Sequence, residues 1–235
     1  MFISHKYQAI FVHIQRTGGN SIQKIFADHD PDLVETIPID PSKQRTKHAW
    51  ITDIVEAIPN EIFTRYVKFS VVRNPFERMV SWYFHFKDDK NAGDADVKVN
   101  PHANPAEARD AHDFAARFTS IGDRVKYAIN TNASTFEQFV MLPRDHPEGL
   151  FERLYANQID YVSQDGHLLV DDVLRFENLT QDFDSFAHKI RFPGRPPHVN
   201  ASSRHKRWQE HYSPQTKAII AERFRRDCER WSYGF

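Results

Sequence analysis

The residues AIFVHIQRTGGNSIQKIF, from Ala9 to Phe26, place an apolar run, a polar turn and a helix start in direct succession. Ala9 to Ile14 is apolar, contains β-branched residues and is too short for a helix, so it predicts a buried strand. Ser21 to Phe26 predicts the first turns of a helix. The turn between them, Gln15 to Asn20, holds two glycines, small polar side chains and a cation. Glycines let a backbone approach a ligand and the free amides of a helix start attract negative charge, so this turn predicts an anion-binding loop.

From these residues alone, the loop could also be an ordinary connection with Ser21 as the helix N-cap, or the phosphate loop of a nucleotide kinase. The kinase pattern G-x-x-x-x-G-K-[ST] is absent, because Gly19 is followed by Asn20 and Ser21. The cation of the loop, Arg16, comes before the glycines, so we expect it to approach a bound anion from the strand side.

The length allows one α/β domain or two small ones, and we expect a single domain, residues 1–235, with a large core. No Gly/Ser-rich or Pro-rich linker divides the 235 residues, 40% of them are apolar, and phenylalanine alone occurs 19 times. The single cysteine, Cys228, excludes an internal disulfide framework and is typical of a reducing compartment.

Localisation and partners also follow from the composition. No apolar segment follows the first residues as a signal sequence requires, and no run approaches the roughly 20 apolar residues of a membrane span. These features predict a soluble, cytoplasmic protein. The formal net charge of −1 carries no signature of nucleic-acid binding, so we expect no nucleic-acid partner and an anion site that is local.

A second strand, turn and helix repeat the order of the first. YVKFSVV, Tyr66 to Val72, predicts a strand, and Pro75 lies near the start of a helix whose apolar residues recur every three or four positions. Arg73 follows the strand, and Ser81 lies about two turns along the helix. Ligands of open α/β sheets bind beyond the carboxyl ends of the strands, so we expect Arg73 and Arg16 to face one crevice. Two anion sites there would suit a nucleoside with phosphates at both ends, whereas a salt bridge at a strand end is the alternative for Arg73.

The rest of the chain predicts further helices, a strand or hairpin, and an insertion. Helices are expected at Trp50 to Ile58, from a capping box of Ser134 and Glu137 through Met141, at Asp182 to Ile190 and from Ser213-Pro214 to about Arg230, and a strand or hairpin at Leu168 to Phe176. Residues 87–112 are charged and lack large apolar side chains. They predict an insertion that is either a disordered surface loop or a lid over the substrate.

The two strand-turn-helix segments resemble the nucleotide-binding segments of a known enzyme family. FVHIQRTGGNSI resembles the 5′-phosphosulfate loop, and KFSVVRNPFERMVSWY the 3′-phosphate segment, of sulfotransferases that use 3′-phosphoadenosine 5′-phosphosulfate (PAPS). The closer resemblance is to the carbohydrate sulfotransferases, whose usual loop reads like HIPKTGGTS; this chain departs from it at Gln15, Arg16 and Asn20. The resemblance extends to NQIDYV, LRFENL, HVNAS and the ending Tyr233-Gly234-Phe235, and so covers most of the chain.

The resemblance implies a P-loop-like α/β fold, with a central parallel sheet flanked by helices in a single domain, and transfer of a sulfuryl group from PAPS to a hydroxyl or an amine. It implies that Arg73 and Ser81 hold the 3′-phosphate, with Arg204 close to the nucleotide. The residues implied to hold the 5′-phosphosulfate are Gln15, Arg16, Thr17, Gly18, Gly19, Asn20 and Ser21. From the residues alone, the basic segment around Arg204 could equally be a solvated surface or a path for an anionic glycan.

The chemistry of sulfuryl transfer gives roles to two side chains. In-line displacement at sulfur places negative charge on the oxygen that leaves toward the phosphate, where the Arg16 cation would stabilise the transition state. A sulfuryl group carries less charge than a phosphoryl group, so no metal is required. The acceptor must also lose a proton, and a histidine can take it. The resemblance favours His48 over His13 and His85 as this base, because the family's glycan enzymes place a histidine in a comparable stretch.

The sequence therefore predicts a PAPS-dependent sulfotransferase that acts on a carbohydrate or a small hydroxylated metabolite. A nucleotide or metabolite kinase on a related fold is one alternative, and a non-catalytic nucleotide-binding module is the other. Neither the identity of the acceptor nor the oligomeric state follows from the sequence, because specificity resides in variable loops.

Overall fold

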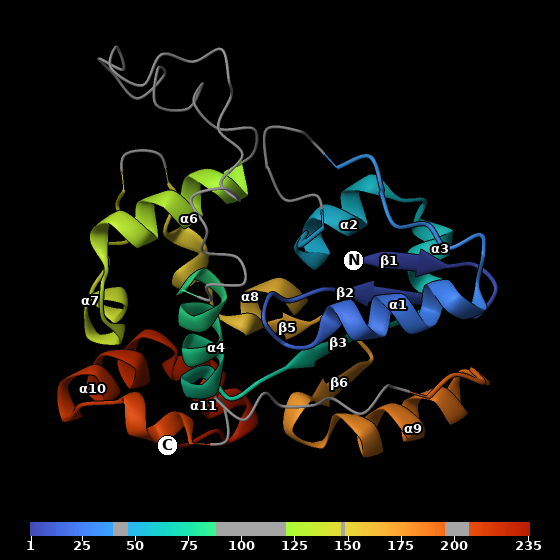
Figure 1. Ribbon diagram of the computed structural model, residues 1–235. Helices are drawn as coiled ribbons and strands as arrows, with labels where there is room; N and C mark the ends of the chain where they lie inside the picture. The colour runs from blue at the N-terminus through green and yellow to red at the C-terminus, as the bar shows by residue number, and fades with distance from the viewer. Residues whose placement is uncertain (40–46, 88–120, 147–148, 196–206) are drawn as a thin grey trace, which may run out of the picture. The chain divides into compact units, whose positions relative to one another are not determined.

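The computed structural model describes residues 1–39, 47–87, 121–146, 149–195 and 207–235 (Figure 1). The contacts within the chain divide it into two compact units. The first unit comprises Met1–Asn74, Asn157–Ser203 and Arg226–Gly234, and the second comprises Pro75–Ala156, Arg204–Arg225 and Phe235.

The first unit is built on a four-stranded sheet with the strand order β1-β2-β3-β6. β2 (Ala9–Val12), β3 (Val67–Val72) and β6 (Asp172–Arg175) are parallel, and β1 (Phe2–Ser4) pairs antiparallel with β2. The predicted central parallel sheet is confirmed, with β1 as an edge strand that the sequence analysis did not predict. Because β2 and β3 are parallel neighbours, the segments that follow them begin at the same edge of the sheet.

Both faces of this sheet are buried. Phe11 and Phe69 on one face, and Ile10 and Val72 on the other, have no exposed surface. Strands that are covered on both sides in this way read as apolar runs, as Ala9 to Val12 does. In β3 the alternating polar residues Lys68 and Ser70 are buried as well.

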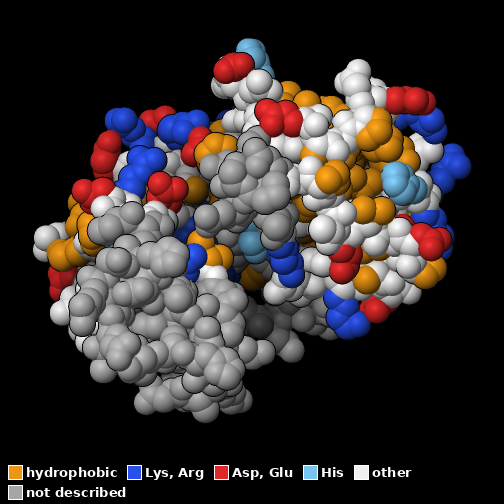
Figure 2. Space-filling view, turned by 90° about the horizontal axis from the view of Figure 1, so that it is seen from above, with side chains coloured by type: hydrophobic (Ala, Val, Ile, Leu, Met, Phe, Trp, Pro, Cys, Tyr) orange, Lys and Arg blue, Asp and Glu red, His pale blue; other side chains and the backbone are white. Residues whose placement is uncertain are grey.

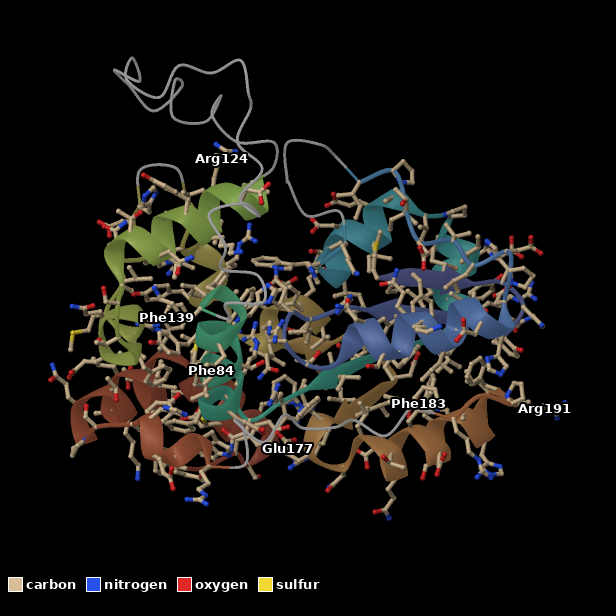
Figure 3. The ribbon with its side chains drawn as sticks, in the orientation of Figure 1. Phe84, Arg124, Phe139, Glu177, Phe183 and Arg191 are labelled. Carbon is tan, nitrogen blue, oxygen red and sulfur yellow. The ribbon has the colours of Figure 1, made fainter. Side chains whose placement is uncertain are left out.

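Two helices cover the face that carries Phe11 and Phe69. α1 (Gly19–His29) and α9 (Leu179–Lys189) contribute apolar side chains at helical spacing to the same core cluster as the strands. The aromatic ring of Phe183 points from α9 toward the sheet (Figure 3) and is fully buried. The other core members from these two helices are Ile22, Ile25, Phe26, Leu179, Phe186 and Ala187.

Shorter elements complete the first unit. They are α2 (Ile51–Ala57), α3 (Asn60–Arg65), α8 (Gln158–Val162), the hairpin of β4 (Ser163–Gln164) and β5 (His167–Leu168), the 3₁₀ helix η3 (Phe176–Asn178) and, from Arg226 on, α11 (Arg225–Trp231). The segment predicted as a strand or hairpin, Leu168 to Phe176, therefore contains the end of this hairpin and all of β6.

The second unit is helical. It contains α4 (Pro75–Lys87), α6 (Ile121–Asn132), α7 (Phe136–Val140), α10 (Pro214–Arg223) and the 3₁₀ helices η2 (Glu152–Leu154) and η5 (Trp208–His211). Phe139 of α7 has no exposed surface and lies with its ring centroid 5.7 Å from that of Tyr83 of α4. Aromatic packing between helices thus forms the interior of this unit.

Two predictions of helix bounds were wrong. The capping box of α7 is made by Thr135 and Gln138, with Gln138 N donating to Thr135 Oγ1 at 3.2 Å, rather than by Ser134 and Glu137. The last long helix is divided at Phe224 into α10 and α11. Ser213 does cap α10, as predicted, by accepting a hydrogen bond from Thr216 N. Except for Lys87, which ends α4, the predicted insertion 87–112 lies outside the described residues.

The face of the molecule drawn in Figure 2 carries mixed charge. In Figure 2, lysine and arginine side chains are interspersed with aspartate and glutamate side chains, in keeping with the formal net charge of −1. Among the helices in the described part of the chain, none is long and apolar enough to span a membrane.

Candidate active site

The loop between β2 and α1 turns through two residues with left-handed backbone conformation. Arg16 has a φ of 66° and Gly18 a φ of 85°. Between them, the buried Thr17 donates a hydrogen bond from Oγ1 to the carbonyl oxygen of Ile14 at 2.8 Å. A left-handed conformation costs a non-glycine residue about 1–2 kcal/mol, and strain of this kind gathers at functional sites. The strain at Arg16 is therefore consistent with a loop shaped for binding.

Close packing requires both glycines of this loop. A Cβ atom at Gly19 would lie 2.2 Å from His13 Cδ2, and one at Gly18 would lie 3.0 Å from Phe176 Cε2. From the sequence, the two glycines were expected to let a ligand approach the backbone. In the structure they also bring the loop against the rings of His13 and Phe176.

Helix α1 begins at Gly19, two positions before the start predicted at Ser21. Gly18 is the N-cap, and Ser21 N donates to the Gly18 carbonyl oxygen at 3.0 Å. Ser21 is therefore not the N-cap that an ordinary connection would use. The first-turn amides of this 11-residue helix directly follow the left-handed turn. Such amides, together with the helix dipole, favour a bound anion.

Arg73 meets this loop at the carboxyl ends of β2 and β3. Its side chain is only 4% exposed, and Nη1 donates a hydrogen bond to the Arg16 carbonyl oxygen at 3.2 Å. The guanidinium carbon lies 4.0 Å from the centre of the Phe176 ring. The two arginines that the sequence analysis singled out are thus brought together, as the parallel pairing of β2 with β3 requires.

These two arginines concentrate positive charge in a partly buried place. Burial, and then the charge of Arg73, lower the pKa of Arg16 to about 10, so its guanidinium is still charged at neutral pH. Neighbouring cations repel each other, and a bound anion would remove that repulsion. The arrangement can therefore hold phosphate or sulfate groups through charge-assisted hydrogen bonds.

Gln158 holds the backbone of Arg73 and was not predicted from the sequence as a site residue. Gln158 Oε1 accepts a hydrogen bond from Arg73 N at 2.9 Å, and Gln158 Nε2 donates one to Arg73 O at 2.8 Å. Gln158 lies in the segment NQIDYV, which was quoted for the family resemblance without a role for any residue. That resemblance was the one signal in the sequence that pointed to it.

Asn74, which follows Arg73, is held by Glu177 from the segment after β6 and by Gly234 near the end of the chain. Asn74 N donates to Glu177 Oε1 at 2.6 Å, and Asn74 Nδ2 donates to the Gly234 carbonyl oxygen at 2.8 Å. Glu177, labelled in Figure 3, also accepts a hydrogen bond from the Tyr233 hydroxyl at 3.0 Å. Burial, and then the Glu177 carboxylate, raise the pKa of Tyr233, so the phenol keeps its proton. The turn after β3 is thus fixed by residues from LRFENL and from the ending Tyr233-Gly234-Phe235.

His48 lies against His13 in the segment that precedes α2. Its Nδ1 is 3.0 Å from the His13 carbonyl oxygen, and the centroids of the two rings are 4.5 Å apart. A carbonyl oxygen only accepts hydrogen bonds, so in the neutral ring of His48 the hydrogen is on Nδ1 and the lone pair is on Nε2. The half-buried His48 ring is therefore oriented as a proton acceptor through Nε2.

Of the two other histidines considered as a base, His13 is less suitable. His13 is 3% exposed, and burial, followed by the charge of His48, lowers the pKa of His13 far below its usual range. Within the described part of the chain, His13 Nδ1 is buried without a hydrogen-bond partner. His85 is exposed on α4, in the second unit.

Gln15 replaces the proline of the usual carbohydrate sulfotransferase loop, and the structure shows what its side chain does. The hydroxyl of Tyr161, which is 3% exposed, donates a hydrogen bond to Gln15 Oε1 at 2.8 Å. Tyr161 belongs to α8, the helix that begins with Gln158. A proline could not make this contact, so Gln15 ties the loop to α8.

Three predicted site residues complete the account: Ser81, Arg204 and Asn20. Ser81 is buried in α4 of the second unit, and its part in 3′-phosphate binding stays a prediction. Arg204 lies outside the described residues. Asn20 is exposed in the first turn of α1. In the described ranges, no group of three or more His, Cys, Asp or Glu residues could hold a metal ion.

A mostly parallel sheet, with a glycine loop and paired arginines at the carboxyl ends of neighbouring strands, defines a class of α/β proteins that bind phosphate-bearing ligands. The chain belongs to the sulfotransferase family, whose sequence profile matches residues 1–234. No curated protein sequence gives a significant match.

Membership of this family makes the protein a PAPS-dependent sulfotransferase, which is the enzyme class predicted from the sequence. PAPS is the sulfuryl donor, and an acceptor substrate is implied. The family match spans residues of both compact units, in agreement with the predicted single α/β domain. It also favours the sulfotransferase over the two alternatives, the kinase and the non-catalytic binding module.

Proposed function

We propose that the protein transfers the sulfuryl group of PAPS to a hydroxyl of a carbohydrate or a small hydroxylated metabolite, with His48 as the general base. The observation that carries this proposal is the placement of three groups. Arg73 bonds to the Arg16 carbonyl oxygen in the anion loop, and His48 bonds to the carbonyl oxygen of His13, just before that loop.

In this proposal the loop and Arg16 hold the 5′-phosphosulfate, and Arg73 holds the 3′-phosphate. The hydroxyl oxygen of the acceptor attacks sulfur while the bond from sulfur to the bridging oxygen breaks. The electron pair of that bond remains on the 5′-phosphate, giving 3′-phosphoadenosine 5′-phosphate (PAP). Arg16 stabilises the charge that develops on this oxygen, and its planar fork replaces the lysine of the usual loop.

The proton of the acceptor goes to His48. Nε2 carries the lone pair of the neutral ring because Nδ1 donates to the His13 carbonyl oxygen. A base must be neutral to accept a proton, so acidification is expected to lower turnover as His48 becomes protonated. A carbohydrate acceptor is supported by the resemblance of the loop to HIPKTGGTS.

The test is transfer from labelled PAPS to a panel of carbohydrates and small hydroxylated compounds. With the best acceptor, His48→Ala is expected to lower kcat by about 10²- to 10⁴-fold, the range for a lost general base, and to leave the affinity for PAP nearly unchanged. Arg16→Ala should lower both, because Arg16 meets the donor in the ground state and in the transition state.

His29 supplies a matched control. Its Nδ1 also bonds to a carbonyl oxygen, that of Ile25 at 2.9 Å, but at the far end of α1. His29→Ala should turn over like the wild type. If His48→Ala does so too, His48 is not the base. If no hydroxylated compound accepts the label and an amine does, the proposed acceptor class is wrong.

A further inference from the structure

The side chain of Gln158 makes the two backbone hydrogen bonds to Arg73 that a neighbouring strand would make. The ladder between β3 and β6 ends where Val72 faces Arg175, and Arg73 follows beyond it. The side-chain amide of Gln158 then satisfies both the N–H and the C=O of Arg73. Gln158 has no exposed surface, so water does not compete for these two hydrogen bonds.

Asp227 of α11 orients the Gln158 amide. Asp227 Oδ2 accepts hydrogen bonds from Gln158 N at 2.8 Å and from Gln158 Nε2 at 3.2 Å, and Oδ1 accepts one from Ile159 N at 3.0 Å. A carboxylate only accepts, so a flipped amide would bring Gln158 Oε1 against Asp227 Oδ2. Asp227, which is itself fully buried, therefore selects the one amide orientation that matches the N–H and C=O of Arg73.

The guanidinium of Arg73 is held at the other end of the side chain. It lies over the Phe176 ring and donates to the Arg16 carbonyl oxygen. A guanidinium binds a phosphate through two parallel hydrogen bonds only if both the backbone of its residue and the orientation of its side chain are fixed. Phe176 and the loop orient the Arg73 guanidinium, and Gln158 fixes the Arg73 backbone.

We propose that Gln158 and Asp227 are positioning residues for recognition of the 3′-phosphate, which they support by fixing the backbone of Arg73. The inference rests on the proposed function, in which Arg73 binds that phosphate. It assigns a role in nucleotide discrimination to two buried side chains that act through the backbone of Arg73.

The test compares the affinities of PAP and adenosine 5′-monophosphate (AMP), which lacks the 3′-phosphate, by calorimetry. Gln158→Met removes both hydrogen bonds to Arg73 and keeps the length of the side chain. It is expected to reduce the preference for PAP over AMP by about tenfold or more, the lower end of what loss of an outer-shell partner costs at metal sites, with the affinity for AMP changed by less than about threefold. Asp227→Asn, which places an amide where the carboxylate accepts three hydrogen bonds, should act in the same direction.

A purely structural role would give a different result, because it would weaken PAP and AMP equally. Ser4→Ala is the matched control. It removes a buried hydrogen bond to Asp30 at the opposite edge of the same sheet, where Ser4 pairs with Ala9. Ser4→Ala should lower the melting temperature and leave the PAP preference unchanged.

Arg73→Ala distinguishes failure of this inference from failure of the proposed function. If Arg73→Ala loses the preference while Gln158→Met and Asp227→Asn keep it, or weaken both nucleotides alike, the inference is overturned and the proposed function stands. If Arg73→Ala itself keeps the preference, Arg73 is not the 3′-phosphate ligand, and the proposed site and the inference are both wrong. Should Gln158→Met fail to fold, as judged by thermal unfolding, Asp227→Asn decides.

Discussion

Replacing Gly19 by alanine is predicted to impair catalysis far more than stability. A Cβ atom there would lie 2.2 Å from Cδ2, 2.3 Å from Nε2 and 3.0 Å from Cε1 of His13. Carbon atoms in contact prefer a separation of about 3.5–4.0 Å, so the ring or the loop must move by more than about 1 Å. The His13 ring cannot withdraw easily, because it is 3% exposed and lies between the rings of Phe11 and His48, with centroids 5.5 Å and 4.5 Å away.

The expected change in folding stability of Gly19→Ala follows from two opposing effects. Overpacking a core costs about 1–3 kcal/mol, and alanine gains up to about 1 kcal/mol over glycine inside a helix. Gly19 is the first residue of α1, where this gain is smaller, so a net destabilisation of about 1–2 kcal/mol is expected. A displacement of about 1 Å in a positioned group can lower turnover about 100-fold, and the clash bears on both the anion loop and the neighbour of His48.

The assay measures kcat with saturating PAPS and acceptor, PAP affinity by calorimetry, and stability by urea denaturation. Gly166→Ala is the control: Gly166 has a φ of 81°, and a Cβ atom there would meet nothing within 4 Å. It should cost about 1–2 kcal/mol of backbone strain without loss of turnover. If Gly19→Ala retains wild-type kcat and PAP affinity, as Gly166→Ala should, the contact between His13 and the loop does not support the site.

Two further predictions concern the rings on either side of this loop. Because burial keeps His13 neutral in the folded protein, the unfolded chain binds one more proton below the ordinary histidine pKa of 6.5. Stability should therefore fall by about 1.4 kcal/mol for each pH unit below that value, and by less in His13→Asn; equal slopes in urea denaturation between pH 7 and pH 5 would contradict this. Phe176→Leu removes the ring under the Arg73 guanidinium and should weaken PAP binding by about 0.5–2 kcal/mol with little effect on AMP. Phe183→Leu, in the core beneath α9, should lower stability alone, and an equal loss of both nucleotides in Phe176→Leu would refute the role of its ring.

Much of the fold could be predicted from the sequence because its repeated unit is local. A short apolar strand, a turn and a helix with apolar residues every three or four positions occupy consecutive residues, and each leaves its own periodicity. Pro75 and Ser213-Pro214 marked helix starts in the same local way, and the structure places α4 and α10 there. Where the signals were weaker, the prediction failed. The three residues of β1 are too few for a periodicity, and Ser134 and Thr135 are both suitable caps for α7.

In the candidate site, too, residues with a local sequence signal were predicted and residues that depend on distant contacts were not. The residues of the anion loop and Arg73 were found because their order along the chain is itself the signal, and the carboxyl ends of parallel neighbouring strands bring them together. Only the tertiary structure revealed that Gln158 and Asp227 fix the Arg73 backbone, since they lie 85 residues from Arg73 and 69 residues from Gln158, respectively. The orientation of His48 was equally inaccessible, because it depends on a carbonyl oxygen 35 residues away. The sequence by itself thus determined the candidate residues for donor binding, through short-range patterns that the backbone geometry imposes. The hydrogen bonds that hold those side chains in place were decided by the tertiary structure, because a buried donor pairs with whichever acceptor the fold brings to it, and no local pattern records that partner.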